Sequence, residues 1–170
     1  MKNLILTIGL FVASLSLANA QKIAVVDINQ ILADMPAYQK AQEDLDKVAA
    51  EWRQEIAQQY DEIKSMYNKY QAEQVLLSDD VKKQREDEIM DKEKDVRELQ
   101  KRKFGPEGEL FVMRRELVNP IQEKVYGAVE QYALESSYDL ILDKAGSAGV
   151  LFASEQFDKT DLIRRRLSIR

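Results

Sequence analysis

The sequence AYQKAQEDLDKVAAEWRQEIAQQYDEIKSMYNKYQAEQVLLSDDVKKQREDEIMDKEKDVRELQKRKF, residues 37–104, contains neither glycine nor proline. Of its 68 residues, 14 are basic and 17 are acidic, so the fraction of charged residues is high and the two signs nearly balance. A long run without backbone breakers and with a thin apolar stripe predicts solvent-exposed helix. Short apolar runs at 23–26 and 140–142 bracket it and predict strands that pair across a large sequence separation. We therefore expect an α+β, mostly helical fold: a small β base and a long antiparallel helical-hairpin (coiled-coil) arm.

The hairpin is expected to consist of one helix from residue 36 to about 77 and a second from about 79. Ser78 would cap the second helix, with Asp79 and Asp80 in its first turn. The second helix has few apolar residues, and Arg85 and Lys92 stand where a coiled coil wants aliphatic side chains. The apolar stripe of the first helix advances in nine steps over 32 residues, 3.56 residues per step. It contains Tyr38, Ala41, Leu45, Val48, Trp52, Ile56, Tyr60, Ile63, Tyr67 and Tyr70.

The base is expected to contain residues 21–35 and 109–170, and the arm residues 36–108. The sequence FGPEG at 104–108 predicts a break, because proline lacks the amide proton that a helix needs. Strands are expected at 21–27 and 138–143, and a third, hairpin-paired strand at 150–153 after the turn GSAG at 146–149. Asp158 or Thr160 would cap a final helix whose inward residues are Leu162, Ile163 and Leu167.

Residues 1–20 have the features of a cleaved signal peptide. Lys2 is followed by an apolar segment at 4–17 and by the small-x-small sequence ANA at 18–20. The apolar segment has 14 residues, fewer than the roughly 20 that span a bilayer, so cleavage after Ala20 is favoured over an uncleaved anchor. We expect a periplasmic mature chain that starts at Gln21.

The composition excludes several classes of function. The sequence has no cysteine and no histidine, which removes thiol chemistry, the commonest metal ligand and the usual general base. Residues 146–149 lack the lysine and following helix of a phosphate-binding loop. Without Lys2 the chain has 24 basic and 30 acidic residues, a net charge of −6, which argues against nucleic acid. The basic clusters at 101–103 and 164–166 are expected to be solvated helix faces. We expect no enzyme activity, no cofactor and no metal.

The aromatic residues of the arm are more numerous than a two-helix seam requires. We expect Tyr38 and Trp52 to fill the seam. For Tyr60, Met66, Tyr67 and Tyr70 the second helix offers few apolar partners, so part of this surface should face outward and contact extended chains. Tyr60 and Tyr67 could also pack in the seam. Met66 and Tyr70 are therefore the cleaner pair of candidates for contact with extended chains.

The base is expected to self-associate. Two or three short strands are marginal in water, so the apolar strand residues should be completed by other copies of the chain. The candidate interface residues are Val25, Leu140, Leu142 and Val150.

The whole pattern resembles the Skp/OmpH family of periplasmic chaperones. The resemblance rests on the signal peptide, KIAVVD at 22–27, IL at 31–32 with Pro36, NPIQEKV at 119–125 and YDLILD at 138–143. The break at 104–108 resembles the Bacteroidetes-type members. The resemblance implies a homotrimer whose helical arms enclose a cavity that holds unfolded outer-membrane proteins without ATP. The arm departs from basic relatives, because residues 71–100 hold 6 basic and 10 acidic residues, which argues against lipopolysaccharide binding.

Two other functions remain open at this stage. One is a coiled-coil structural spacer, and the other is an envelope scaffold that docks a folded partner. A spacer should show regular aliphatic seam positions on both helices, which Arg85 and Lys92 disfavour.

Overall fold

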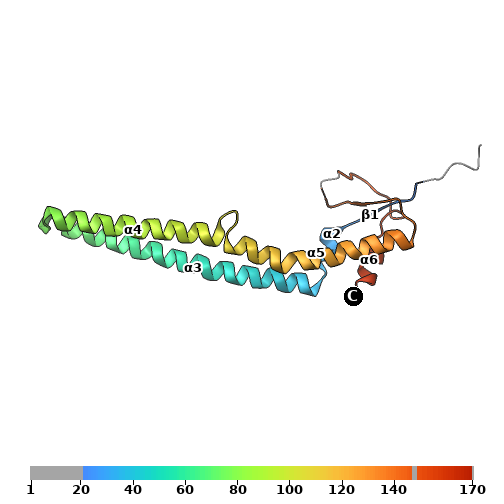
Figure 1. Ribbon diagram of the computed structural model, residues 1–170, viewed down its shortest axis with the longest axis horizontal. Helices are drawn as coiled ribbons and strands as arrows, with labels where there is room; N and C mark the ends of the chain where they lie inside the picture. The colour runs from blue at the N-terminus through green and yellow to red at the C-terminus, as the bar shows by residue number, and fades with distance from the viewer. Residues whose placement is uncertain (1–20, 147–148, 170) are drawn as a thin grey trace, which may run out of the picture. The chain divides into compact units, whose positions relative to one another are not determined.

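The computed structural model describes residues 21–146 and 149–169. The expected signal peptide at 1–20 and residues 147–148 of the expected turn lie outside this range. The described chain packs as two units: residues 21–31 with 125–169, called the base below, and residues 32–124, called the arm. This division places residues 109–124 with the arm, whereas the sequence pattern grouped them with the base. The chain is mostly helical with a small sheet, as expected (Figure 1), and the two strands of the sheet are parallel.

The base is built on two parallel strands, β1 (Ile23–Val26) and β2 (Leu140–Asp143). Ile23 pairs with Leu140 at one end of the ladder and Val26 with Asp143 at the other. The β-branched run of β1 is buried, with Val25 4% and Val26 1% exposed, which explains its continuous apolar character.

The third segment of the sheet is not where the sequence placed it. The Val25 amide donates to the Phe157 carbonyl at 2.9 Å, and the Lys159 amide donates to the Val25 carbonyl at 2.9 Å. Residues 157–159 therefore occupy the edge of β1 opposite β2, in a parallel bridge at Asp158. The strand predicted at 150–153 is wrong, because those residues form no regular structure.

Asp158 organises the junction between this edge and α6 (Thr160–Arg166). Its carboxylate accepts hydrogen bonds from the Thr160 amide at 2.9 Å and the Thr160 hydroxyl at 2.6 Å, and pairs with the Lys144 ammonium at 2.7 Å. The Asp27 amide in turn donates to the Thr160 hydroxyl at 2.9 Å. The N-cap residue of α6 is Lys159, which makes no side-chain cap, so neither expected residue occupies that position: Asp158 lies one residue before it and Thr160 one residue after it.

Only one of the three residues expected to face inward from this last helix is fully buried. Ile163 is 0% exposed, Leu167 is half-buried, and Leu162 is 39% exposed. The expectation for Leu162 is wrong, because a helix of two turns buries a single narrow face.

The arm contains α3 (Pro36–Glu73), the short 3₁₀ turn η1 (Gln74–Leu76), α4 (Asp79–Phe104) and the first part of α5 (Glu109–Glu135). The short helix α2 (Ile28–Ala33) precedes α3, and α3 begins at Pro36, whose fixed φ suits a first helical position. The chain reverses at η1, and α4 runs back along α3 (Figure 1). Ser78 is the N-cap residue of α4 as expected, but its side chain makes no capping hydrogen bond. The break expected at 104–108 is present, and α5 continues through Pro120.

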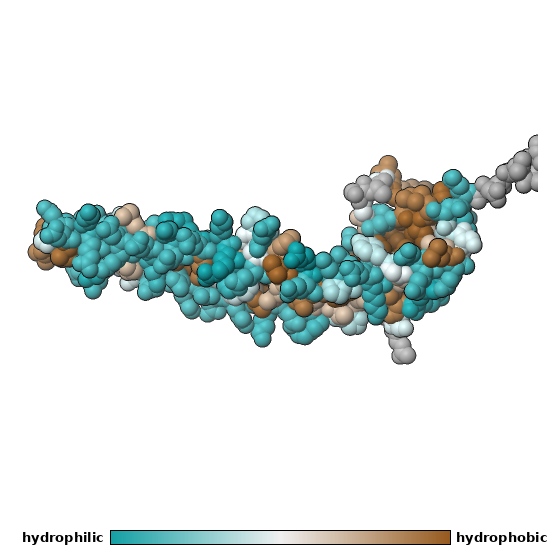
Figure 2. Space-filling model, viewed as in Figure 1, coloured by the Kyte–Doolittle hydropathy of each residue, from teal (hydrophilic) through white to brown (hydrophobic). Residues whose placement is uncertain are grey.

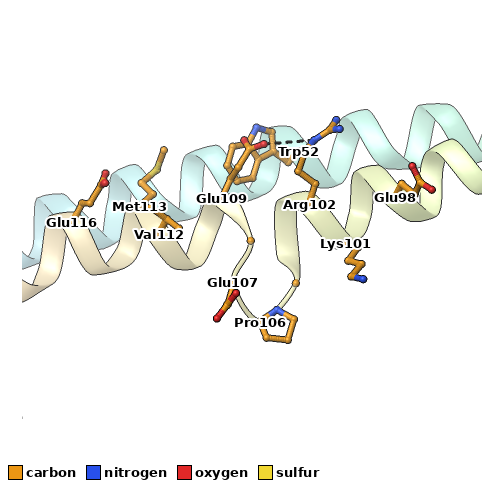
Figure 3. Close-up of a pocket in the computed structure, with 12 residues that line it drawn as sticks. Trp52, Glu98, Lys101, Arg102, Pro106, Glu107, Glu109, Val112, Met113 and Glu116 are labelled. Carbon is orange, nitrogen blue, oxygen red and sulfur yellow. Dashed lines mark ion pairs between the residues drawn. The ribbon is translucent and has the colours of Figure 1, made fainter.

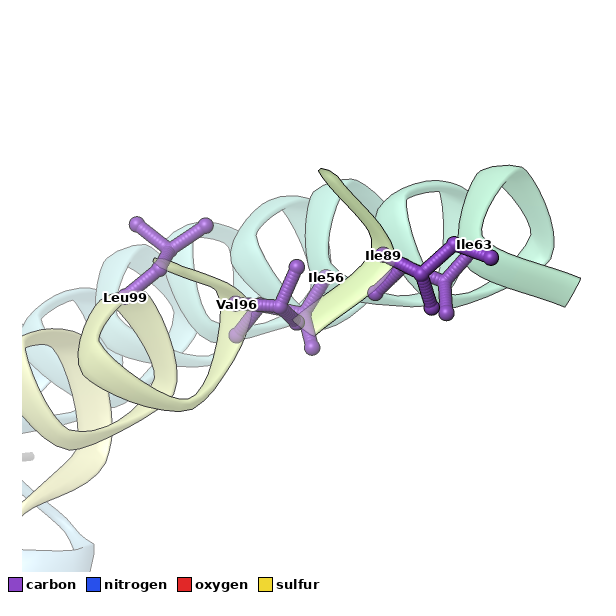
Figure 4. Packing of buried hydrophobic residues seen from close by; sticks show 5 residues of the cluster. All are labelled: Ile56, Ile63, Ile89, Val96 and Leu99. Carbon is purple, nitrogen blue, oxygen red and sulfur yellow. The ribbon is translucent and has the colours of Figure 1, made fainter. Parts of the chain in front are cut away.

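The α3–α4 seam follows a heptad pattern. Its buried cluster joins two residues of α3 to three of α4, namely Ile56, Ile63, Ile89, Val96 and Leu99 (Figure 4). The repeat of seven between Ile56 and Ile63, and between Ile89 and Val96, is that of a left-handed coiled coil. Lys92 lies between Ile89 and Val96, and its ammonium pairs with Glu62 of α3 at 3.0 Å. The positive charge of Lys92 in the seam is therefore balanced by a carboxylate of the opposite helix.

The Asp158 network generates a prediction about the stability of the base. Burial raises the pKa of the Asp158 carboxyl, but hydrogen bonds from Lys144 and Thr160 outweigh it and hold the pKa below its ordinary value. Asp158→Asn should lower the free energy of unfolding at neutral pH by about 1–2 kcal/mol, since it leaves partly buried donors unsatisfied. Because folding lowers this pKa, the contribution is present above the unfolded pKa and lost as pH falls through the folded one.

The measurement is urea unfolding at one fixed protein concentration, followed by circular dichroism at neutral and acid pH. The difference between wild type and Asp158→Asn should shrink in acid. Glu130→Gln, an exposed change in the same unit, is the control and should behave as wild type. An Asp158→Asn effect that is the same at both pH values would contradict the prediction.

Candidate functional site

Four residues of α3 were expected to contact extended chains, and the two that the structure exposes are not the two that the sequence analysis preferred. Tyr60 and Tyr67 are 43% and 49% exposed, whereas Met66 and Tyr70 pack against the buried seam cluster. By exposure, the structure favours Tyr60 and Tyr67 over Met66 and Tyr70 as the pair open to extended chains. The reason is the seven-residue repeat, which puts Met66 and Tyr70 at the seam and rotates Tyr60 and Tyr67 to its edge.

The hydroxyls of two tyrosines tie the helices together. The Tyr70 hydroxyl donates to the Glu86 carboxylate of α4, and this hydrogen bond raises the pKa of Tyr70 above its ordinary value. The Tyr60 hydroxyl lies 3.4 Å from the Gln100 side-chain oxygen, while much of its ring stays open to solvent. Tyr60 thus presents an apolar face with a fixed polar end.

The tip of the arm carries apolar side chains that sequence reasoning missed. Val75 and Leu76 in η1 are each 87% exposed, and Val81 at the start of α4 is 38% exposed. Figure 2 shows a brown patch at the end of the arm, whose surface in this view is mostly hydrophilic. The signal was available: the sequence VLL at 75–77 follows the apolar stripe at the point where the helix turns back and no partner helix continues.

The break between α4 and α5 depends on two glycines. A Cβ on Gly105 would lie 2.3 Å from the Lys101 carbonyl oxygen. A Cβ on Gly108 would lie 2.8 Å from the Arg102 carbonyl oxygen and 2.9 Å from that of Lys103. These contacts are with backbone atoms, so only glycine permits the loop to close so tightly between two helices.

Charge and aromatic contacts close this break. The Glu109 carboxylate, at the start of α5, pairs with Arg102 at 3.6 Å and with Lys103. The Lys103 ammonium lies 4.3 Å from the Trp52 ring centroid, and the Phe104 ring meets Trp52 edge to face at 6.1 Å. The expectation that 101–103 is a solvated cluster is wrong for Lys103, whose side chain is 16% exposed. Trp52 is partly buried and contacts Phe104 and Lys103 at the end of α4, outside the buried seam cluster.

The base exposes apolar residues beside its sheet. Ile23 and Leu140, which are paired in the ladder, are 37% and 47% exposed, and Leu151 and Phe152 are 100% and 85% exposed. Figure 2 shows hydrophobic residues gathered on this unit. Of the other predicted interface residues, Leu142 and Val150 are half-buried. Val25 is buried within the protomer's own sheet, so it contributes to that core.

Comparison with known proteins identifies the family. Residues 22–167 match the family described as outer membrane protein (OmpH-like). The chain belongs to this family. No curated protein is significantly similar to it in sequence.

A solved structure shares the fold. It is the crystal structure of a protein from Caulobacter crescentus CB15 described as an OmpH-like outer membrane chaperone. The TM-score is 0.68 at 13% sequence identity, and the match covers 86% of this chain and 83% of that one. Among residues 21–146 and 149–169, no helix combines the length and apolar character that a bilayer span requires.

The glycine contacts at the break generate a prediction. Gly108→Ala should lower the free energy of unfolding by about 1–3 kcal/mol, because the new methyl group meets backbone atoms that cannot move aside cheaply. Gly127→Ala is the matched control, since among the described residues nothing outside its own helix backbone lies within 4 Å of its Cβ position, and alanine favours helix. Thermal unfolding followed by circular dichroism should show a lower midpoint for Gly108→Ala and an equal or higher one for Gly127→Ala. Equal midpoints for the two variants would contradict this account of the loop.

Proposed function

We propose that the protein is an ATP-independent periplasmic holdase that binds unfolded outer-membrane proteins and keeps them from aggregating. The observation that carries the proposal is the set of apolar side chains that the α3–α4 seam leaves exposed on a charged arm. They are Tyr60, Tyr67, Val75, Leu76 and Met90, exposed by 43%, 49%, 87%, 87% and 56%. Family membership and the chaperone description of the Caulobacter relative support the same function.

The chemistry of these side chains suits clients without a fixed structure. Tyrosine offers a large ring with a polar end, and methionine adapts its shape to many partners. The sites are separated along the arm, so an extended chain would make several weak contacts instead of one specific one. Such binding needs no nucleotide-driven step, because release follows from the weakness of each contact.

The proposal includes a homotrimer whose arms enclose the client. Its support is the exposed apolar surface of the base, where Leu140 lies on a strand that has β1 as its neighbour in the described sheet. An unpaired strand edge beside apolar side chains favours association with further copies of the chain. A periplasmic location follows from the predicted signal peptide and the family.

The acidic arm restricts the partners. Residues 71–100 hold 6 basic and 10 acidic residues, so we propose no lipopolysaccharide binding and no electrostatic attraction of acidic clients. A spacer or scaffold function is less well supported, because cations such as Lys92 occupy seam positions that a rigid spacer would fill with aliphatic residues.

Holdase activity gives a direct test. The mature chain, residues 21–170, should suppress the light scattering of a β-barrel membrane protein diluted from urea. A variant with Tyr60, Tyr67, Val75 and Leu76 replaced by serine should need about tenfold more protein for half-suppression, a loss of roughly 1.4 kcal/mol of binding. The matched control replaces four exposed amide side chains of α3 by serine, at Gln54, Gln58, Asn68 and Gln71.

The control variant should suppress aggregation as wild type does, with arm helicity equal in both variants by circular dichroism. Met66→Ser with Tyr70→Ser should instead lower the thermal stability of the arm, since these residues pack on the seam. Unchanged suppression by the variant that lacks the four apolar side chains, at intact helicity, would count against the proposal.

The oligomer is tested separately. Leu140→Asp puts a charge on an exposed apolar position, so it should dissociate the trimer while the base stays folded. Val25→Asp should unfold the base itself, because it buries an unpaired charge in the protomer. Sedimentation velocity with circular dichroism distinguishes the two results. A wild-type chain that sediments as a folded monomer at every concentration would refute the trimer.

A further inference from the structure

An open cleft of about 960 Å³ lies on the arm at the break between α4 and α5. Its apolar lining comes from Trp52 of α3, Pro106 of the loop, and Val112 and Met113 of α5. We call it the mid-arm cleft. Its volume is in the range of small-ligand pockets and large enough for two or three side chains, but not for a folded partner.

The walls of the mid-arm cleft are held by contacts that need no occupant. Phe104 and Lys103 fix the Trp52 ring, and Glu109 ties the two helices together through Arg102 and Lys103. Figure 3 shows Arg102 and Glu109 approaching each other beside Trp52, while Pro106 and Glu107 project from the loop. A preformed cleft binds with a smaller ordering cost than one that must assemble around its ligand.

The rim of the cleft has an excess of unpaired negative charge. Arg102 and Glu109 pair with each other, so the remaining charged lining residues are Glu98, Lys101, Glu107 and Glu116. None of these four makes an ion pair within the described part of the chain. Three carboxylates against one ammonium leave a net charge of −2 around an apolar floor.

We propose that the mid-arm cleft binds a short extended segment of non-native polypeptide in which an aliphatic side chain stands next to lysine or arginine. The inference rests on the proposed holdase function and names the client chemistry for one site on the arm. The aliphatic group covers Trp52 and Met113, whose flexible thioether adapts to different shapes. The neighbouring cation meets the carboxylates of the rim, which supplies selectivity by charge complementarity.

The protein carries its own reporter for this site, because Trp52 is the single tryptophan of the chain. The mature protein is titrated with three blocked octapeptides without aromatic residues: one with alternating leucine and lysine, one with leucine and glutamate, and one with serine and lysine. The leucine–lysine peptide should give a saturable change in Trp52 fluorescence. The other two should bind at least about fivefold more weakly, because each lacks one of the two complementary features.

Variants locate the effect. Glu98→Gln with Glu116→Gln should weaken leucine–lysine binding about threefold to tenfold and reduce the preference over the leucine–glutamate peptide. Met113→Ser should weaken both leucine-containing peptides. Asp87→Asn with Asp91→Asn, two exposed carboxylates of α4 that do not line the cleft, is the matched control and should titrate as wild type.

The outcomes separate this inference from the proposed function. Equal responses to the three peptides would overturn the proposed binding of such segments in the mid-arm cleft, even if aggregation suppression is intact. An unchanged titration in Glu98→Gln with Glu116→Gln would do the same. Selective peptide binding by a protein that fails to suppress aggregation would support the cleft and reject the holdase. A fluorescence change with protein concentration alone, or with phosphatidylcholine vesicles, would overturn the inference by placing a second copy or a bilayer in the cleft.

Discussion

The parallel pairing of β1 with β2 is the constraint on which the rest of the fold depends. It joins residues as far apart as Lys22 and Asp139, 117 positions along the chain. Parallel strands need a crossover connection, and here the crossover includes both helices of the arm. Bringing such distant segments together costs chain entropy, which the α3–α4 hairpin reduces by returning the chain before the strands meet. The arm is thus both the proposed client-binding surface of the protein and the connection that lets its sheet form.

The seam between α3 and α4 explains why that surface is available. Five buried aliphatic residues form its cluster. Two lysines of α4 have partners of their own: Lys92 pairs with Glu62. Lys103 pairs with Glu109 and lies over the Trp52 ring. A seam this narrow covers only part of the apolar surface of α3. Tyrosines at its edge and the aliphatic residues of the tip remain in contact with water. This exposed apolar surface does not stabilise the fold, but it is available to bind the proposed clients. The same polar helices keep the exposed groups from forming one large aggregating patch.

The likeness to the Caulobacter protein shows how little sequence this architecture requires. A TM-score of 0.68 accompanies 13% identity. A charged helical hairpin is specified by the spacing of a few aliphatic residues and by the absence of breakers, so most surface positions can vary. Features such as the glycine-dependent break and its Trp52–Lys103 contact are therefore places where one member can acquire properties of its own.

The sequence by itself determined the elements of this protein. The breaker-free run, the bracketing strands, the turn at Ser78 and the break at 104–108 follow from local rules that act within a few residues. The tertiary structure decided which side chains face which partner. The apolar stripe of α3 contained Tyr60, Tyr67 and Tyr70 alike, but pairing with α4 imposes a seven-residue repeat that packs Met66 and Tyr70 on the seam and leaves Tyr60 and Tyr67 exposed.

The sheet shows the same division. The apolar run at 150–153 has the composition of a strand but forms none, whereas residues 157–159 pair with β1 through hydrogen bonds to Val25. The position of 157–159 beside β1 is stabilised by contacts of Thr160 with Asp27 and of Asp158 with Lys144, which no single segment encodes. Lys103 likewise belongs to a basic cluster in the sequence, and only the approach of Trp52 and Glu109 turns it into a buried contact. Local sequence determined the helices and the two paired strands, whereas contacts between segments distant in the chain decided how the remaining residues pack and which side chains stay exposed.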